Sequence, residues 1–141
     1  MNDYGVYAVR ICKNGEWKEV VVDDYFPCYS RGAHRGKPTF SHANGNEMWV
    51  LLMEKAYAKL HGSYERIEAG FAEHVLHDLT GAPSEVVESE NKNLFEIMKK
   101  ADKQQWAMAA SAGSTESSKK QLESLGLVGG HSYGLIGVCE V

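Results

Sequence analysis

The sequence is poor in cysteine and contains no long apolar segment. Its three cysteines, Cys12, Cys28 and Cys139, are odd in number and far apart, which argues against a disulfide framework and indicates a reducing compartment. No segment comes near the roughly 18 apolar residues that a membrane-spanning helix requires. The first residues also lack the charged and apolar pattern of a signal peptide. These absences predict a cytoplasmic protein without a membrane span.

Basic residues are fewer than acidic ones. The chain contains 15 lysines and arginines against 19 aspartates and glutamates, and its formal net charge at pH 7 is −4. The basic residues are spread along the sequence, whereas nucleic-acid-binding proteins gather them into a patch. A nucleic-acid partner is therefore not expected. With 43% hydrophobic and 24% charged residues, the composition of the 141 residues is that of one folded globular domain.

Turn-forming residues divide the first third of the chain. Two segments rich in β-formers, 4–12 and 17–22, flank Asn14-Gly15, a dipeptide typical of tight β-hairpin turns. Residues 23–46 contain prolines, glycines and polar residues, which indicate an irregular surface loop with a short strand near residues 39–41. The chain is therefore expected to open with a hairpin and a long loop.

Helical periodicity follows in three segments. Residues 47–61 have apolar residues at helical spacing, with Asn46 as the expected N-cap, Glu47 in the first turn and Gly62 after the end. A shorter helix is predicted within residues 71–79. Residues 91–102 predict a further helix with one apolar face.

The last third of the chain favours strands. Residues 105–111 predict a buried strand, and residues 112–118, which are small and polar, predict a flexible loop. Residues 119–125 have an ambiguous pattern. A glycine-rich turn then leads into a closing strand that begins at His131 and runs toward Val141. The predicted fold class is α+β, a helical segment combined with antiparallel strands.

Five stretches resemble the calpain family of papain-like cysteine peptidases, in the same order and at similar separations. They are residues 15–17 with 20–27, residues 46–49 with 51–65, and residues 78–81, 93–95 and 130–133. The resemblance covers nearly the whole chain and implies the central portion of a papain-like peptidase core. Residues 1–69 would be the end of the first, helix-containing subdomain, and residues 70–141 the start of the second, β-rich subdomain.

The resemblance implies roles for a histidine and two glycines. His131 resembles the catalytic base, and a histidine, with an ordinary pKa of about 6.5, can take a proton from a thiol and return it to a leaving amine. Without the resemblance, a structural histidine at the start of a strand is the simpler interpretation. Gly70 and Gly130 match glycines whose backbones flank the substrate, although both also fit turn glycines, and Ala69 replaces a usual second glycine.

Glu47 matches a carboxylate that binds calcium in classical calpains. Calcium takes about six or more oxygen ligands, and one carboxylate supplies at most about two of them. The other ligands would come from residues before Met1, so Glu47 is here interpreted as a helix N-terminal charge. The chain alone is expected to bind no cofactor, and the resemblance leaves calcium open for the full-length protein.

Two members of the family's catalytic triad have no match here. The nucleophilic cysteine of a Gly-x-Cys-Trp motif and the asparagine of an Asn-Pro-Trp motif are both missing, and the three cysteines are interpreted as small semi-buried hydrophobes. The prediction is part of the catalytic domain of a calpain-like cysteine endopeptidase that is inactive by itself. Either a longer peptidase supplies the missing residues, or a diverged calpain-like protein uses the fold as a non-catalytic interaction module.

Other partners and sites remain open. Tyr25, Phe26, Tyr29 and Arg31 in the long loop are of the types that anchor interfaces. A zinc site would use His74, His77 and Asp78, which share a helix face. The expected partners are a protein or peptide substrate and the rest of the peptidase domain. An exposed sheet edge would also offer a route to self-association.

Overall fold

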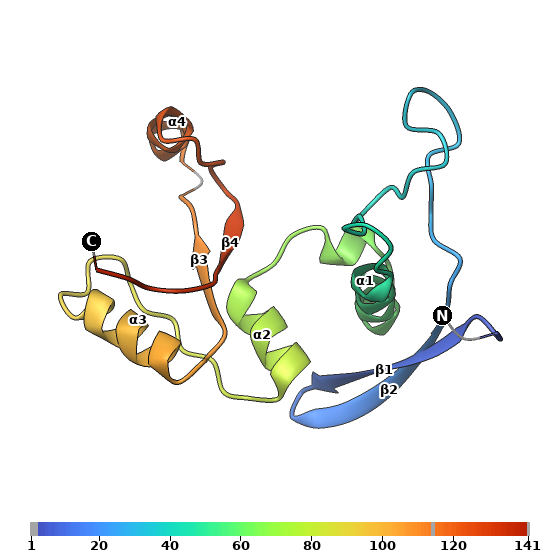
Figure 1. Ribbon diagram of the computed structural model, residues 1–141, viewed down its shortest axis with the longest axis horizontal. Coiled ribbons are helices and arrows are strands. Elements are labelled where there is room, and N and C mark those ends of the chain that lie inside the picture. Colours follow the sequence, from blue (N-terminus) through green and yellow to red (C-terminus); the bar gives the residue numbers. More distant parts are fainter. Residues whose placement is uncertain (1–2, 114, 141) are drawn as a thin grey trace. The chain divides into compact units, whose positions relative to one another are not determined.

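The computed structural model describes residues 3–113 and 115–140, which fall into two compact units (Figure 1). The N-terminal unit extends to Gly70 and includes Asp78–Gly81, and the C-terminal unit contains Phe71–His77 and the residues from Ala82 onward. The described residues contain four α-helices and two small antiparallel sheets, so the predicted α+β class is confirmed. No helix in this part of the chain is long and apolar enough to cross a membrane.

A β-hairpin opens the N-terminal unit, as the sequence predicts. Strands β1 (Val6–Lys13) and β2 (Glu16–Asp23) pair antiparallel over their full length. Asn14 and Gly15 connect them with φ angles of 55° and 78°, the left-handed conformation that a two-residue hairpin turn requires. The inner face of this hairpin supplies most of the core described next.

Helix α1 (Trp49–His61) packs on the hairpin and buries its apolar face there (Figure 1). Ala56 is fully buried against Ile11, Val20 and Val22, and the small alanine side chain allows close approach of the helix to the strands. Partly buried residues surround this cluster, namely Tyr7, Val9, Leu52, Tyr57 and Leu60. These contacts form the hydrophobic core of the N-terminal unit.

The predicted start of this helix is wrong by two residues. Met48, not Asn46, occupies the N-cap position, its carbonyl accepts the hydrogen bond from the Leu52 N–H, and no side chain caps the helix. Glu47 lies outside the first turn, because its carboxylate accepts a hydrogen bond from the Trp49 indole instead (3.2 Å). The predicted end is confirmed at Gly62, whose φ of 105° ends the helix.

The connection between β2 and α1 is irregular, as expected. An isolated antiparallel bridge joins Cys28 to Pro38. The short strand predicted near residues 39–41 does not form, because pairing ends at the Cys28–Pro38 bridge, to which the Thr39 N–H bond to Pro27 belongs, and Ser41 bonds to the Glu54 carboxylate. A 3-10 helix, η1 (Glu65–Ile67), follows α1.

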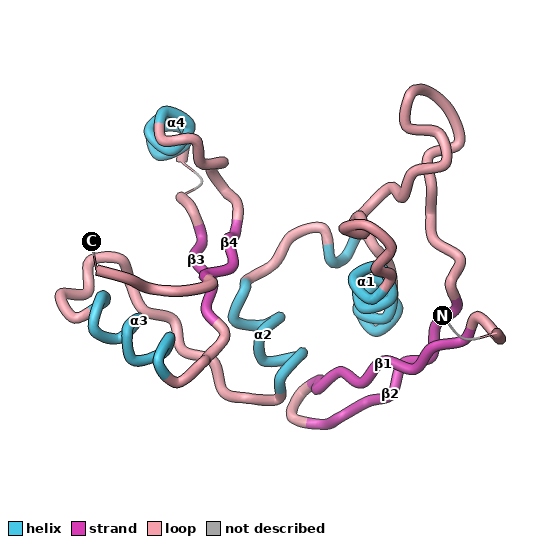
Figure 2. The backbone as a smooth tube through the Cα atoms, viewed as in Figure 1, coloured by secondary structure: helices cyan, strands magenta, loops and turns pink. Residues whose placement is uncertain are grey.

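Three helices and a second antiparallel strand pair lie in the remainder of the described chain (Figure 2). Helix α2 (Ala72–Thr80) confirms the predicted short helix and is shared by the two units, which divide after His77. Helix α3 (Leu94–Lys103) begins three residues after the predicted start. The reason is that Asn91 forms a turn in which its side chain accepts from the Asn93 N–H and its carbonyl from the Leu94 N–H.

The strands of the C-terminal unit are shorter and more exposed than predicted. Strands β3 (Met108–Ser111) and β4 (Ser132–Leu135) pair antiparallel. The predicted start at residue 105 is wrong because Gln105 has a φ of 56° and forms a turn after α3. The expectation of a buried strand is also wrong, since three of the four β3 residues are exposed.

Helix α4 (Glu116–Ser124) occupies the segment with the ambiguous pattern. Its N-cap is Thr115, whose side chain accepts from the Ser118 N–H at 3.2 Å, so the predicted loop ends at residue 115. The predicted closing strand covers only Ser132–Leu135, and residues 136–140 are irregular. Ser114 of the predicted loop and Val141 of the predicted strand lie outside the described residues.

Candidate functional site

His131 lies immediately before β4, and backbone hydrogen bonds hold it in place. The Ala112 N–H donates to the His131 carbonyl (2.8 Å), and the Gly130 N–H donates to the Gly113 carbonyl (3.0 Å). Both bonds continue the β3–β4 ladder beyond its last paired residues. Gly130 has a φ of 70°, a left-handed conformation that favours glycine. The structure therefore brings Gly130 and His131 together in one ordered turn.

The imidazole of His131 is exposed and rests on a tyrosine. Its ring lies edge-on to the Tyr133 ring, with 4.9 Å between centroids and an angle of 81°. The Tyr133 hydroxyl accepts a hydrogen bond from the Val128 N–H at 2.7 Å, which ties the tyrosine to the loop before the histidine. Residues two apart on a strand share a face, so Tyr133 sets one side of the space around the imidazole.

Gly70 lies apart from this turn in the chain, at the end of the main segment of the N-terminal unit. It is exposed, a Cβ added there would meet no atom within 4 Å, and its φ lies outside the left-handed region. Neither its backbone conformation nor its immediate surroundings require glycine. The substrate-flanking role of Gly70 therefore stays a prediction.

Glu47 is an exposed residue ahead of α1, and its carboxylate is engaged by the Trp49 indole. Across residues 3–113 and 115–140, no three histidine, cysteine or acidic side chains are grouped as a metal site would need. Glu47 by itself does not satisfy the coordination that calcium demands. A calcium role for Glu47 stays a prediction that depends on further ligands.

The buried polar centre of the N-terminal unit is Asp78, at the end of α2, which is only 4% exposed. Its Oδ2 accepts hydrogen bonds from Lys13 Nζ (2.8 Å) and from Tyr57 Oη (3.0 Å). His61 Nε2 lies 3.9 Å from the same oxygen, and the His61 ring lies against the Tyr57 ring. The Asp78 carboxylate is thus hydrogen-bonded both to Lys13 at the end of β1 and to Tyr57 in α1.

Opposing effects set the pKa values in this Asp78 cluster. Burial disfavours the ionised form of Asp78, but hydrogen bonds from Lys13 and Tyr57, with the positive charge nearby, outweigh burial and lower its pKa. Burial, reinforced by the hydrogen bond to Asp78, raises the pKa of Tyr57 to about 12. At neutral pH the ionised Asp78 carboxylate therefore accepts a hydrogen bond that the neutral Tyr57 phenol donates. This arrangement stabilises the fold and does not exchange a proton as an acid-base pair would.

The zinc site considered from the sequence does not assemble. Asp78 is committed to Lys13 and Tyr57, His77 Nδ1 lies 2.9 Å from the Ala82 carbonyl, and the His74 ring packs edge-on against Phe71. Sequence reasoning missed the true role of Asp78. A usable signal was the i, i+4 spacing of Tyr57 and His61, which places two polar groups on the inner face of α1.

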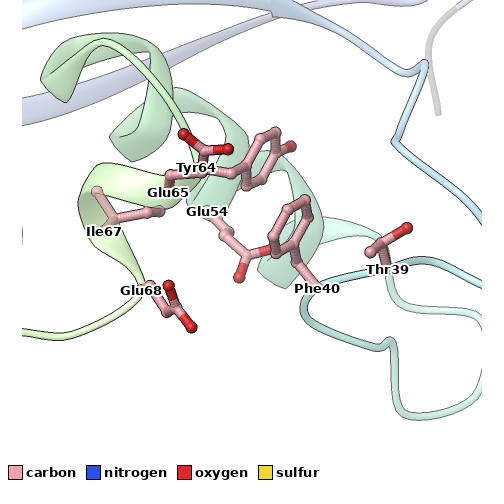
Figure 3. Close-up of a pocket in the computed structure, with 7 residues that line it drawn as sticks. All are labelled: Thr39, Phe40, Glu54, Tyr64, Glu65, Ile67 and Glu68. Atoms are coloured by element: carbon pink, nitrogen blue, oxygen red, sulfur yellow. The ribbon is translucent and has the colours of Figure 1, made fainter.

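A hollow of about 420 Å³ lies in the N-terminal unit beside η1 (Figure 3). The rings of Phe40 and Tyr64 stack on each other in its lining, with centroids 4.3 Å apart, and Glu54 lies beside them while accepting hydrogen bonds from Ser41. Burial raises the pKa of Tyr64, and the nearby carboxylate of Glu54 adds to this effect. The remaining lining residues are Thr39, Glu65, Ile67 and Glu68. The lining contains no nucleophilic cysteine or histidine, so this hollow offers no peptidase chemistry.

The cysteines differ in exposure. Cys12 is buried, and a Cβ added at Gly81 would lie 3.6 Å from its sulfur. Cys28 and Cys139 are exposed, so the interpretation of all three as semi-buried hydrophobes is wrong for these two. The Cys28 thiol donates a long hydrogen bond to the Phe26 carbonyl (3.4 Å).

Comparison with known proteins places these features in a family. The whole chain, residues 1–141, matches the family described as calpain family cysteine protease. The chain is 41% identical to a calpain-type cysteine protease of Zea mays, 35% to Calpain-A of Drosophila melanogaster and 33% to Calpain-9 of Homo sapiens. These matches cover 97–99% of the chain but only 7%, 17% and 20% of the respective relatives. The chain therefore belongs to the calpain family of cysteine proteases and represents a portion of its catalytic domain.

Proposed function

We propose that these residues form the histidine-bearing part of a calpain-type cysteine endopeptidase, which in the complete protein hydrolyses peptide bonds of protein substrates. The observation that carries this proposal is the ordered turn at Gly130 and His131, in a chain that matches the family from end to end. Two backbone hydrogen bonds hold the turn, one to the His131 carbonyl and one from the Gly130 N–H, and the imidazole is left exposed for contact with other groups.

The proposed chemistry begins with a proton transfer. His131 takes the proton of a cysteine thiol, and the thiolate attacks the carbonyl carbon of the scissile peptide bond. The protonated imidazole then gives its proton to the departing amine, which leaves an acyl-enzyme thioester. Water, deprotonated by the same imidazole, hydrolyses the thioester and restores the thiol. The cysteine, and the asparagine that orients the imidazole, would come from outside these 141 residues.

The remaining roles follow from the same proposal. Gly70 and Gly130, both exposed, would let an extended peptide approach their main-chain groups closely. Residues 1–69 and 70–141 would belong to the first and second subdomains of the papain-like core. Calcium would bind at Glu47 only together with ligands from elsewhere in the complete protein.

The test compares two histidines in the full-length protein. We expect His131→Ala to lower kcat/KM on casein or a fluorogenic peptide by about a thousandfold or more, because a general base typically contributes up to about 10⁴-fold. The control is His42→Ala, which removes an exposed loop histidine that is not among the proposed site residues. Unchanged activity of His131→Ala, or equal loss in both variants, would refute the assignment. The 141-residue chain alone is expected to cleave neither substrate.

The same experiment separates the peptidase from a non-catalytic interaction module. Tyr25 in the long loop is 83% exposed, the kind of aromatic that a binding module presents. A module predicts no hydrolysis by the full-length protein under any condition, and a partner whose binding survives His131→Ala. Hydrolysis that depends on His131 would exclude this alternative.

We further propose a cytoplasmic location and association through sheet edges. Within the described residues each sheet has only two strands, so its outer edges present backbone groups that another strand could pair with. The rest of the peptidase domain, or a second copy of the chain, would supply that strand. Light scattering of the 141-residue chain should show an average mass that rises with concentration, and a strict monomer would contradict self-association.

Fractionation of cells that express the full-length protein tests the proposed cytoplasmic location.

A further inference from the structure

The long loop of the N-terminal unit contains a closed segment, residues 28–38, which we call the basic loop. The Cys28–Pro38 bridge closes its base, the Tyr29 N–H donates to the Lys37 carbonyl (3.0 Å), and the Gly36 N–H donates to the Tyr29 carbonyl (2.8 Å). Inside the loop, the Arg35 N–H donates to Gly32 and the Lys37 N–H to His34. In Figure 1 the segment between β2 and α1 extends away from these two elements as a loop that turns back on itself. The basic loop is thus an ordered projection.

Charge on this loop is of one sign. Arg31, Arg35 and Lys37 fall within seven residues, and no aspartate or glutamate occurs from residue 25 to residue 46. The chain as a whole has a net charge of −4, so the loop is a local exception. The interpretation of the basic residues as evenly spread is therefore incomplete, because it overlooked this segment without carboxylates.

The three cations are available for a partner. All residues from 31 to 37 are exposed, and no ion pair found among the described residues involves Arg31, Arg35 or Lys37. By contrast, Lys13 and Lys55 are held by Asp78 and Asp23. Tyr29, also exposed, lies against His34 with 5.8 Å between ring centroids and adds an aromatic surface beside the cations.

We infer that the basic loop is a docking surface for an acidic peptide segment of a partner protein. The two arginines offer planar guanidinium groups that bind carboxylates in a bidentate manner. An ordered loop also loses less conformational freedom on binding than a disordered basic tail would. The loop would recruit proteins that carry runs of glutamate or aspartate.

Other anionic partners fit less well. Basic clusters that hold a protein on an anionic membrane usually contain about four to eight lysines and arginines, more than this loop provides. A nucleic-acid site needs a wider basic surface than three residues on an acidic protein. A peptide of a few carboxylates matches both the size and the charge of the loop.

The test measures binding of the 141-residue chain to a fluorescein-labelled peptide of alternating glutamate and serine, by fluorescence anisotropy at low salt. The triple variant Arg31→Gln, Arg35→Gln, Lys37→Gln should bind roughly tenfold or more weakly, since exposed ion pairs each contribute modestly and three are removed. The wild-type affinity should fall at about 0.2 M salt because the charges are screened. Circular dichroism checks that the variants stay folded.

The matched control is Lys18→Gln, Lys92→Gln, Lys120→Gln, which removes the same charge from exposed positions elsewhere. We expect this control to bind like the wild type within about twofold, because these lysines lie outside the loop. Equal weakening in both triple variants, or no binding by the wild type at low salt, would overturn the inference. So would binding to phosphatidylserine vesicles or to a DNA duplex that exceeds binding to the peptide. The measurement involves no hydrolysis, so its failure leaves the proposed peptidase function untouched.

Discussion

The N-terminal and C-terminal units differ in where their apolar side chains lie. Among the described residues, every buried apolar side chain except Ala101 belongs to the N-terminal unit, where α1 packs on the β1–β2 hairpin. Both units expose large apolar side chains, but the C-terminal unit, which exposes Phe95, Trp106, Leu125, Leu127, Val128 and Ile136, has only Ala101 as a buried apolar counterpart among the described residues. The N-terminal unit has a core of its own, and the C-terminal unit has very little.

In the C-terminal unit, hydrogen bonds rather than buried apolar side chains make most of the contacts that hold the segments together. The β3–β4 ladder, the Thr115 cap of α4 and the bonds around Gly130 are mostly backbone interactions between exposed segments. An exposed hydrogen bond contributes little net free energy, because water competes for both partners. The proposed catalytic histidine therefore lies in the unit whose order depends less on side-chain burial.

The largest expected effect is the loss of a core side chain from the N-terminal unit. Ile11→Ala should lower the free energy of unfolding by about 2–5 kcal/mol, because Ile11 is fully buried and its removal leaves a cavity. Ile136→Ala in the C-terminal unit should change it by less than about 0.5 kcal/mol, since Ile136 is fully exposed. Urea unfolding measures both values, and similar losses in the two variants would break the comparison.

A pair of glycines gives the next largest effect. Gly81→Ala should cost about 2–4 kcal/mol, because φ is +69° and the new Cβ would lie 2.8 Å from Trp17 Cζ2. Gly126→Ala should cost only about 1–2 kcal/mol, since its φ of +77° is similar but no atom lies within 4 Å. The difference in urea unfolding between these variants isolates the contact with Trp17. Equal costs would mean that Trp17 moves aside freely.

Removal of the buried carboxylate should have a smaller effect. Asp78→Ala should cost about 1–3 kcal/mol, because Lys13 and Tyr57 lose their common acceptor in a largely buried place. Asp102→Ala is the matched change in the C-terminal unit, where Asp102 Oδ2 accepts from the Val138 N–H at 3.3 Å. Its cost should stay below about 1 kcal/mol. Thermal unfolding followed by circular dichroism ranks the two, and a larger loss for Asp102→Ala would contradict the difference between the units.

The smallest effect is a pH dependence of stability that arises in the Asp78 cluster of the N-terminal unit. The pKa of Asp78 is lowered in the folded protein, so its contribution is present above its unfolded value of about 3.9 and is lost as pH falls through the lower folded value. The raised pKa of Tyr57 has the opposite sign, and its contribution is lost as pH rises from about 10 toward 12. The wild type should therefore lose more unfolding free energy than Asp78→Asn between pH 6 and pH 3. Parallel curves would show that Asp78 is not the titrating group.

Local signals in the sequence predicted most of the elements. The Asn14-Gly15 dipeptide predicts the hairpin because both residues accept positive φ, and Gly62 predicts the end of α1 for the same reason. Errors arose where a side chain competes with the backbone pattern. The Glu47 carboxylate accepts a hydrogen bond from the Trp49 indole, and Glu47 lies before the first helical residue. Gln105 adopts a positive φ, and no sequence motif predicts this conformation.

The site was less accessible to sequence reasoning than the fold. His131 and Gly130 were singled out by resemblance, and the structure shows their ordered turn while their roles stay proposals. From the sequence, Asp78 stands out only as one ligand of a zinc site that remains open, because His74 and His77 share its helix face. Its real partners, Lys13 and Tyr57, lie 65 and 21 residues away, and a pattern within one helix contains no information on such contacts.

The three thiols differ in exposure, so the reaction of the buried one can be used to measure local unfolding of the N-terminal unit. Cys28 and Cys139 can react with an alkylating reagent in the folded chain, whereas Cys12 lies buried beside Gly81 and Trp17. A reagent can reach Cys12 only when the N-terminal unit opens, so the rate of its alkylation counts opening events without any introduced label. Mass spectrometry of samples taken over time would measure the rate of Cys12 alkylation and thereby the frequency with which this unit opens in the native protein.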